Sequence, residues 1–316
     1  MKKIIIIILI FTCGCSFKKE MCETNLFYMD TVINIKIYDN DKKKVNKAFN
    51  EIENIFKEYQ KLTDYYNSNS DLSKLNNSSS NEIILDDKLA YLINTGLIWN
   101  NKSNGLLNIN IGGVTKLWHD FRNDEKQLPT LDELSKIDTN INNIKLKDNL
   151  LIKQGNVNID LGAITKGYVT QLAGDYLENI QLPYYIINAG GNVLVGKSTK
   201  NYYNIGIASP TSSNTNIAII KAQNISVVTS GGYERFKEID NIKYHHIIDP
   251  KTKYPATIMK SVTVIGKDSA LCDIMSTILF LMDIESGQEF IKDYDIDVLW
   301  IDNNDKIIKS SGFKYE

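Results

Sequence analysis

The chain has 316 residues, of which 43% are apolar and 23% are charged, and its formal net charge is −2. This length is enough to bury a large core, in one large domain or in two closely packed lobes. The apolar fraction argues against long disorder, and the balanced charge gives no basic surplus of the kind that binding to nucleic acid favours.

The N-terminus has the pattern of an export signal. Residues 1–3 carry positive charge, and the apolar run over 4–11 is too short to span a bilayer. Gly14 precedes Cys15, which resembles the lipobox of bacterial lipoproteins, although Thr12 stands where a lipobox usually has Leu. We therefore expect a lipoprotein signal peptide over 1–15 with Cys15 acylated, a polar tether over 16–25 and one folded domain over 26–316. An ordinary secretory signal peptide is the alternative.

The lipid anchor would determine the cellular location of the protein. It would hold the domain on the extracytoplasmic face of the bacterial cytoplasmic membrane, which is the periplasmic side in a Gram-negative cell.

Periodicity predicts both strands and helices in the rest of the chain. Residues 29–38 alternate apolar and polar side chains and predict a strand, and Asp41 can cap a helix that follows. Helical spacing recurs over 87–102, 165–180 and 272–282. Short strands are expected at 184–189, 192–196, 203–208, 217–222, 226–230, 243–248, 261–266 and 297–302. This mixture predicts an α+β fold in one compact unit of two closely associated lobes.

Two glycine-containing segments could approach an anion. In residues 160–167, Gly162 and Gly167 lie where a strand gives way to a helix N-terminus, and Lys166 adds a positive charge. The spacing is neither that of a Walker motif nor that of GxGxxG. The second segment, residues 188–192, is either a hairpin loop that needs positive φ or a ligand contact.

Asp273 and Thr277 lie four residues apart in an expected helix, which places a carboxylate and a hydroxyl on one face. Both are hard oxygen donors of the kind that Mg²⁺ prefers. Thr277 could equally bond back to its own helix, while an Asp in an apolar helix needs a partner or a solvent-filled site.

His245 and His246 follow a Ser-Gly-Gly segment at 230–232 whose backbone N–H groups could approach an anion. Alternation along a strand places the two imidazoles on opposite faces. A paired histidine on a strand is more often structural than catalytic, although histidine is the side chain that exchanges protons near neutral pH.

Taken together, these segments resemble the ApbE family, the FAD:protein FMN transferases, over nearly the whole mature chain. The matching segments, in order, are MDTVINIKIY, DYYNSNSDLSKLN, GLLNINIGGVTKLWHDF, IDLGAITKGY, NAGGN, TSGGYERF, HHIIDPKTKYP and DIMST. The resemblance implies mixed, mainly antiparallel sheets with packed helices. It also implies FAD as substrate, Mg²⁺ as cofactor, and transfer of FMN to a Thr or Ser hydroxyl of an acceptor protein, such as a membrane redox-complex subunit, with release of AMP.

Motif positions in this resemblance imply individual roles. The backbone carbonyl of Ala163 would join Asp273 and Thr277 as metal ligands, and His246 would assist proton transfer. The positions that would contact FAD are Met29, Tyr66, Leu107, Asn108, Ile109, Asp160, Lys166 and Ile247.

Four residues depart from the family pattern. Asp30 and Lys253 each replace a glycine, and Asn108 and Asn110 stand where Asp and Thr are usual. The turn at Lys253 is therefore not expected to need positive φ, and the charge of one loop contact is lost.

Two other functions fit the same residues. One is a Mg²⁺-dependent FAD pyrophosphatase that releases FMN and AMP, and the other is a lipoprotein that binds flavin without catalysis. The Asp273/Thr277 pair and His246 argue against the second, because binding alone requires neither.

Overall fold

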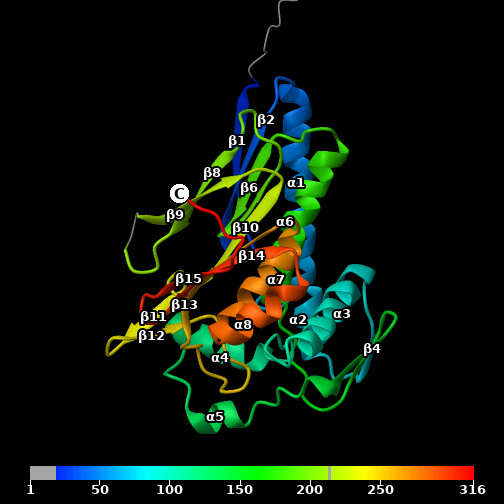
Figure 1. The fold of residues 1–316 in the computed structure, drawn as a ribbon. Coiled ribbons are helices and arrows are strands. Elements are labelled where there is room, and N and C mark those ends of the chain that lie inside the picture. The colour runs from blue at the N-terminus through cyan, green and yellow to red at the C-terminus, as the bar shows by residue number, and fades with distance from the viewer. Residues whose placement is uncertain (1–18, 213–214) are drawn as a thin grey trace, which may run out of the picture.

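A computed structural model describes residues 19–212 and 215–316, and an eight-stranded sheet organises it (Figure 1). Neighbouring strands of this sheet are all antiparallel. Their order is β1 (Met21–Tyr28), β2 (Thr31–Tyr38), β6 (Tyr185–Ala189), β7 (Asn192–Val195), β10 (Ile225–Gly231), β13 (Met259–Gly266), β14 (Ile296–Asp302) and β15 (Ile307–Lys309). The expected signal peptide, with Cys15, lies outside the described residues.

The first hairpin shows that the tether expected over 16–25 was drawn too long, because β1 begins at Met21. Residues 21–25 pair with β2 as part of β1, and alternate side chains of β1, among them Cys22 and Leu26, pack against the main core. The tether was placed too far along because its polar residues occupy the outer face of a half-buried strand. Met29 and Asp30, expected to begin a strand, instead form the two-residue turn, with φ of 54° and 58°.

The helices cover one side of the large sheet. α1 (Lys42–Thr63) begins at Asp41, whose side chain accepts the Lys44 N–H as expected of a cap. α6 (Gly162–Asn179) packs along α1 and against α7 (Ser269–Phe280), and α7 lies over β10 and β13. The remaining helices are α2 (Asp71–Asn77), α3 (Asp87–Lys102), α4 (Gly112–Arg122), α5 (Leu131–Ser135) and α8 (Ile284–Phe290), with 3₁₀ turns at Ile141–Asn143 and Ile291–Asp293.

Three small sheets complete the fold. Their strands are β3 (Glu82–Ile84), β4 (Ile144–Lys147) and β5 (Leu150–Lys153), then β8 (Tyr203–Ala208) with β9 (Asn216–Ala222), and β11 (Phe236–Ile239) with β12 (Ile242–His245). All their pairings are antiparallel too. The expected α+β class with mainly antiparallel sheets and packed helices is thus confirmed.

The apolar core is built in three clusters. The largest fills the space between the sheet and the helices, and a second lies under β8 and β9. The third joins α4 to the segment after β12, through Trp118, Phe121 and Ile248. Among the described helices none is both long and apolar enough to cross a bilayer.

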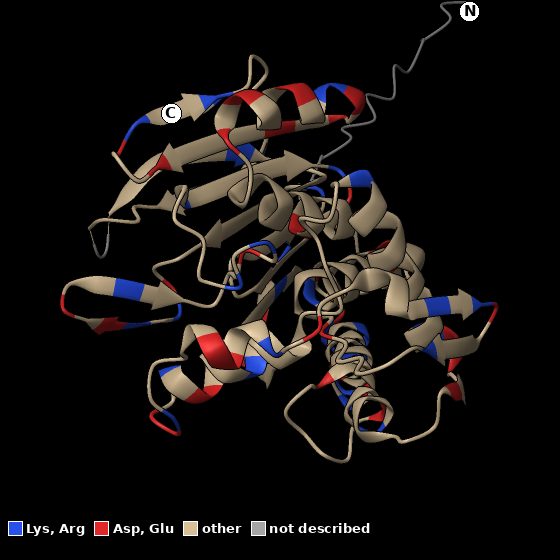
Figure 2. Ribbon diagram, turned by 90° about the horizontal axis from the view of Figure 1, so that it is seen from below, with Lys and Arg blue, Asp and Glu red and all other residues tan. Residues whose placement is uncertain are grey.

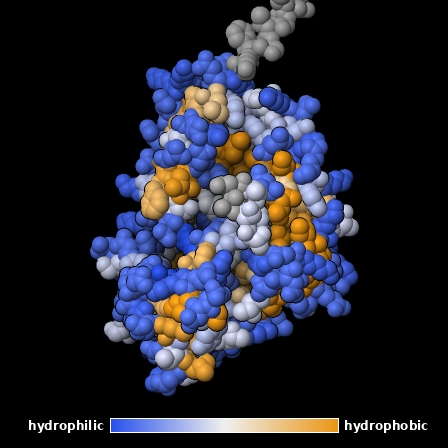
Figure 3. Space-filling model, turned by 90° about the vertical axis from the view of Figure 1, so that its left-hand side faces the viewer, coloured by the Kyte–Doolittle hydropathy of each residue, from blue (hydrophilic) through white to orange (hydrophobic). Residues whose placement is uncertain are grey.

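The surface mixes polar and apolar groups. Figure 2 shows basic and acidic positions interspersed along the ribbon. On the face that carries β8 and β9, Figure 3 shows apolar groups in separate patches among polar ones. On this face the surface therefore has several small apolar areas.

Two local expectations near the third cluster were wrong. The strand expected over 243–248 ends at His245, because β11 supplies no pairing partner beyond that residue. Lys253 adopts a φ of 60°, since its N–H must reach the Asp249 carbonyl to close the turn. Its ammonium donates to the carbonyls of Leu134 and Ile137 at 3.0 and 2.6 Å, which helps to hold this strained conformation.

Candidate active site

The site begins where α6 and α7 cross. A Cβ atom at Gly167 would lie 2.3 Å from the Asp273 Cβ and 2.7 Å from the Ser269 carbonyl oxygen. Only glycine therefore permits the two helices to approach this closely. The crossing brings a carboxylate from α7 against the first turns of α6.

Asp273 is 5% exposed and well supplied with partners. Its Oδ2 accepts the Gly167 N–H at 2.7 Å, and its Oδ1 lies 3.5 Å from the Lys166 Nζ. In a regular helix the Gly167 N–H would bond to the carbonyl of Ala163, four residues back. The Asp273 carboxylate therefore competes with the Ala163 carbonyl for this N–H.

Thr277 adds a hydroxyl one turn further along α7. Its Oγ1 donates to the Asp273 carbonyl at 3.3 Å, a weak bond, while Ser276 Oγ donates to the same carbonyl at 2.9 Å. The junction thus carries a carboxylate, a hydroxyl and a helix carbonyl, all hard oxygen donors that suit Mg²⁺. Within residues 19–212 and 215–316 there is no cluster of three or more His, Cys, Asp or Glu side chains that could hold a metal ion.

Asp160 holds the start of α6 to a neighbouring loop. Its Oδ1 accepts the Gly162 N–H at 2.8 Å, its Oδ2 accepts from Thr115 Oγ1 at 2.6 Å, and its own N–H donates to the Ile109 carbonyl. The side chains of Leu107 and Ile109 are buried in the core. These two predicted FAD contacts can therefore be made only through the backbone.

Asn108 and Asn110, which depart from the family pattern, use their side-chain amides to hold a loop in place. Their amide nitrogens donate to the Thr139 and Asn140 carbonyls at 2.9 and 3.0 Å. The Oδ1 of Asn110 accepts the Asn158 N–H, so each amide both donates and accepts. A carboxylate in place of Asn108 could not donate its bond. The amides brace the 107–110 loop against the segment that precedes β4.

Tyr66 presents an aromatic ring at the surface, with 49% of the residue exposed. The ring stacks on His119, with centroids 3.8 Å apart and planes 20° apart. Its neighbour Tyr65 meets it edge-on and donates to Asn158 Oδ1 at 2.7 Å. An open, anchored aromatic pair of this kind can stack with a planar ligand ring.

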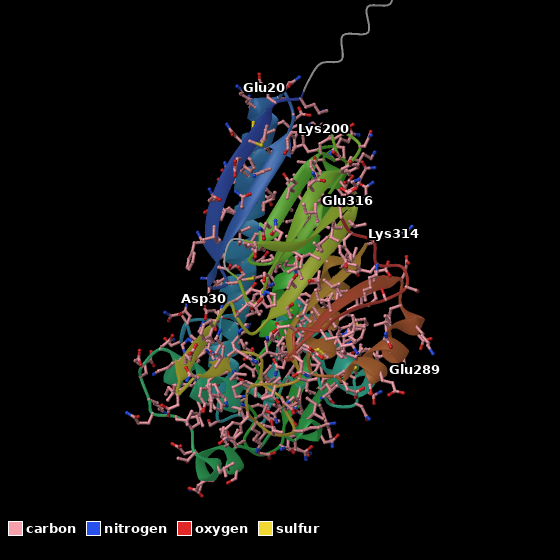
Figure 4. All side chains as sticks on the ribbon, turned by 60° about the vertical axis from the view of Figure 1, so that its left-hand side comes forward. Glu20, Asp30, Lys200, Glu289, Lys314 and Glu316 are labelled. Carbon is pink, nitrogen blue, oxygen red and sulfur yellow. The ribbon has the colours of Figure 1, made fainter. Side chains whose placement is uncertain are left out.

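Met29 lies at the tip of the β1–β2 hairpin, where its N–H donates to Gln60 Oε1. The same tip is joined to the segment before β11, because Arg235 pairs with Asp30 Oδ2 at 2.9 Å and donates to the Asp30 carbonyl at 2.7 Å. Figure 4 shows Asp30 at the end of the hairpin opposite to Glu20.

The two histidines have different environments. His245 is buried, donates from Nε2 to the Ala256 carbonyl at 2.8 Å, and accepts the N–H of Ile247 on Nδ1 at 3.2 Å. It meets Phe280 edge-on, so its role is structural, as expected. Ile247 is itself 7% exposed and contributes to the core.

His246 has a ring nitrogen, Nδ1, that is buried and without a hydrogen-bond partner among the described residues. Burial, followed by the positive charges of Arg235 and Arg122, lowers the pKa of His246 to about 3. The imidazole is therefore neutral near pH 7, with one nitrogen unused. A bound anion would offset these positive charges and raise the pKa toward the range that suits a general base.

Sequence patterns did not point to three charged residues of the site. Glu234 lies 3.1 Å from where a Cβ of Gly191 would be and feels the charges of Lys166 and Asp273. Arg122 and Arg235 act on His246. Single charged residues are usually solvated surface groups, so nothing local distinguishes these three.

Asp273, Lys166, Ala163 and Thr277 are thus brought together at one junction. Met29 is the neighbour of Asp30, which pairs with Arg235. The binding roles of all the predicted residues stay predictions.

Comparison with known proteins places the chain in a family. The ApbE family model matches residues 29–300. The chain is 30% identical over 291 residues to the FAD:protein FMN transferase of Klebsiella pneumoniae (strain 342), covering 90% of each protein. It is 28% identical to that of Vibrio cholerae serotype O1, covering 97% of this chain and 96% of the relative.

Solved structures agree. The flavin transferase ApbE from Vibrio cholerae superimposes with a TM-score of 0.81 at 25% identity, covering 93% of this chain and 98% of that one. The ApbE protein of Thermotoga maritima gives a TM-score of 0.84 at 25% identity, covering 92% and 97%. The chain therefore belongs to the ApbE family and, like these relatives, is a transferase.

Proposed function

We propose that the chain is a Mg²⁺-dependent FAD:protein FMN transferase, which moves FMN from FAD to a Thr or Ser hydroxyl of an acceptor protein and releases AMP. The observation that carries the proposal is the α6–α7 junction, where the Asp273 carboxylate accepts the Gly167 N–H and lies 3.5 Å from the Lys166 ammonium. The names of the relatives support the reaction type.

The junction residues would hold the metal. The Ala163 carbonyl, Asp273 and Thr277 would bind Mg²⁺, which, when bound, neutralises charge on a pyrophosphate. Lys166, 3.5 Å from Asp273, places a further positive charge beside the same phosphates.

His246 would act as the base. The hydroxyl oxygen of the acceptor attacks the phosphorus of the FMN half of FAD, and its proton passes to His246 Nδ1. A new O–P bond forms while the P–O bond to the AMP half breaks, so AMP leaves with the bridging oxygen and the acceptor carries FMN as a phosphoester. Reactions of this kind depend mainly on positioning and charge stabilisation.

The remaining predicted contacts would orient FAD. Tyr66 offers an exposed ring for stacking, and Asn108 and Asp160 fix the loop whose backbone at Leu107 and Ile109 would line the nucleotide. Met29 and Ile247 would contribute apolar surface from the hairpin tip and from the segment after His246.

Hydrolysis of FAD by water and binding without catalysis are the alternatives on this site. The full chain is incubated with FAD, Mg²⁺ and a candidate acceptor, the small molecules are separated by chromatography, and the acceptor is weighed intact. We expect AMP in solution and FMN on the acceptor. Free FMN with an unmodified acceptor would establish hydrolysis instead, and unchanged FAD would leave binding alone.

We also propose that acylated Cys15 anchors the domain on the extracytoplasmic side of the membrane. The first described residues lie at the Glu20 end of the β1–β2 hairpin, opposite to Asp30 (Figure 4). The eight residues of β1 span roughly 27 Å, at about 3.3 Å per residue. The hairpin would therefore hold the site away from the lipid surface, where a membrane-bound acceptor can be reached.

A further inference from the structure

The chain has only two arginines among its 36 basic residues, and both approach His246. Arg122 ends α4, and its Nη1 lies 3.4 Å from the carbonyl oxygen of His245, which belongs to the peptide bond entering His246. Arg235 comes from the segment before β11, more than a hundred residues later. Two guanidinium groups from distant elements thus lie close enough for their charges to act on one imidazole.

The two arginines differ in how their charge is balanced. Arg235 pairs with Asp30. Arg122 takes part in none of the ion pairs that occur over 19–212 and 215–316, and its one hydrogen bond is long. Burial, and then the neighbouring charge of Arg235, lower the pKa of Arg122. A partly buried cation without a counter-ion is costly, and an anion bound beside Arg122 would offset this cost.

A second observation points to a ligand in the same place. The Nδ1 of His246 is buried and lacks a partner among the described residues, although it lies beside the two guanidinium groups. Buried polar atoms without a partner are rare in folded proteins, and a bound water, ion or ligand is one reason for them.

We infer that Arg122 and Arg235 form a guanidinium pair that holds the non-bridging oxygens of the phosphoryl group being transferred, with Arg122 as its open member. The inference rests on the proposed function. A hydroxyl that gives its proton to His246 Nδ1 must attack a phosphorus atom within a few Å of that nitrogen, and hence close to both arginines. A guanidinium can donate two parallel N–H bonds to phosphate oxygens, and its charge stabilises the charge that develops there during transfer.

A purely structural role for Arg122 makes a different prediction. As the last residue of α4 it also lies where a positive charge interacts favourably with the helix dipole. That role needs no anion, is filled equally well by lysine, and affects stability alone. Removal of the guanidinium would then lower Tm without any effect on which flavin binds.

The test compares FMN with riboflavin, which lacks the phosphate. Affinities of both for the full-length chain are measured by flavin fluorescence with Mg²⁺ present, for wild type, Arg122→Gln and Arg122→Lys. We expect wild type to prefer FMN, and Arg122→Gln to reduce this preference by about 10- to 100-fold, as for the loss of charged hydrogen bonds. Arg122→Lys keeps the charge and the fold and should restore only part of the preference, because it lacks the planar pair of donors.

A matched control removes a charge from the same region. Lys243 is an exposed residue of β12, and its ammonium lies over Phe236. Lys243→Gln should leave the FMN preference unchanged. In the transfer assay we expect kcat/KM to fall about 100-fold for Arg122→Gln, the usual cost of losing one donor to a developing oxyanion, with no change for Lys243→Gln.

The inference is overturned if Arg122→Gln keeps the wild-type preference for FMN, if Lys243→Gln loses as much, or if wild type does not distinguish the two flavins. Full recovery by Arg122→Lys would also overturn it. These outcomes do not depend on transfer. A wild-type chain that prefers FMN but modifies no acceptor would refute the proposed function and leave the guanidinium pair standing.

Discussion

At the scale of single residues, Asp273 has two tasks that can be separated. It accepts the Gly167 N–H and so shapes the start of α6, and it would supply the one carboxylate of the metal set. Asn has an oxygen that can take the same N–H but carries no charge. Alanine has neither.

Asp273→Asn is therefore expected to keep the fold and lose Mg²⁺-dependent turnover, by at least about 100-fold. Asp273→Ala should lose turnover as well and unfold more easily, by about 1 to 3 kcal/mol, because the Gly167 N–H remains buried without a partner. AMP release at increasing Mg²⁺ concentration and chemical denaturation measure the two effects. Wild-type turnover in either variant would refute the metal assignment.

His246 gives a prediction about pH. Its folded pKa of about 3 lies below the value near 6.5 of an unfolded chain, so between these values the unfolded state binds more protons. Stability therefore falls as pH drops from 6.5 toward 3, and His246 contributes up to about 2 kcal/mol of that loss between pH 7 and pH 5.

Denaturation of wild type and His246→Gln at pH 7 and pH 5 measures this contribution. We expect the variant to lose less stability on acidification than wild type. Equal losses would show that His246 titrates normally in the folded state. The comparison must be made without flavin, because a bound anion would offset the positive charges of Arg122 and Arg235 and raise the pKa of His246.

The sequence was informative about residues whose role follows from a local pattern. Asp41 as a helix cap, the pair of glycines in the 188–192 turn and the structural nature of His245 could all be predicted. The partners of Asp273, and the convergence of Arg122 and Arg235, could not. They depend on how two helices cross and on how loops fold back, and neither follows from a local sequence pattern.

At the scale of elements, the contact between α6 and α7 positions the chemistry. Both helices were expected, because apolar residues recur at helical spacing along each segment. Their closeness comes from Gly167, whose missing side chain lets the Asp273 carboxylate reach the backbone of α6.

Gly167→Ala tests this contact. The added methyl group would meet Asp273 and the Ser269 carbonyl below 3 Å, so the helices must move apart. We expect a loss of about 1 to 3 kcal/mol of stability, typical of overpacking, and a weaker apparent affinity for Mg²⁺. Unchanged Mg²⁺ affinity in Gly167→Ala would contradict the account.

The control for this substitution needs a glycine with room around it. Gly174→Ala does not qualify, since a methyl group there is also crowded, by Leu194. Gly155 serves better, because an added Cβ there would meet no atom closer than 4.0 Å. Asn tolerates the positive φ of this position, so Gly155→Asn should leave the Mg²⁺ affinity unchanged.

The errors of prediction at this scale share a cause. β1 was overlooked because its outward side chains, among them Glu23 and Asn25, are exposed to solvent. The strand that ends at His245 was extended too far because β-branched residues continue beyond the reach of β11. In both cases tertiary pairing decided where the strand lies.

At the scale of the whole molecule, the fold is that of the ApbE family from the first hairpin to the last strands of the large sheet. The order of the motifs along the chain was enough to predict this class. The sequence could not show how far the site lies from the N-terminal end, which depends on the path of β1 and β2.

The anchor leads to a prediction for the whole protein. Cys15→Ser removes the thiol that we expect to be acylated, so the chain should move from the membrane fraction to the soluble or secreted fraction while keeping its turnover of FAD. Cell fractionation and labelling with a radioactive fatty acid measure this. Retention in the membrane without label would contradict the lipoprotein assignment.

Transfer of FMN, the central claim, is tested most directly by the ratio of AMP released to FMN bound to the acceptor. Full-length protein, FAD and Mg²⁺ are incubated with an acceptor protein and with the same acceptor whose target Thr or Ser is replaced by Ala. We predict one FMN bound for each AMP released with the first and neither product with the second. Release of AMP from both, with free FMN and no modified acceptor, would contradict the account.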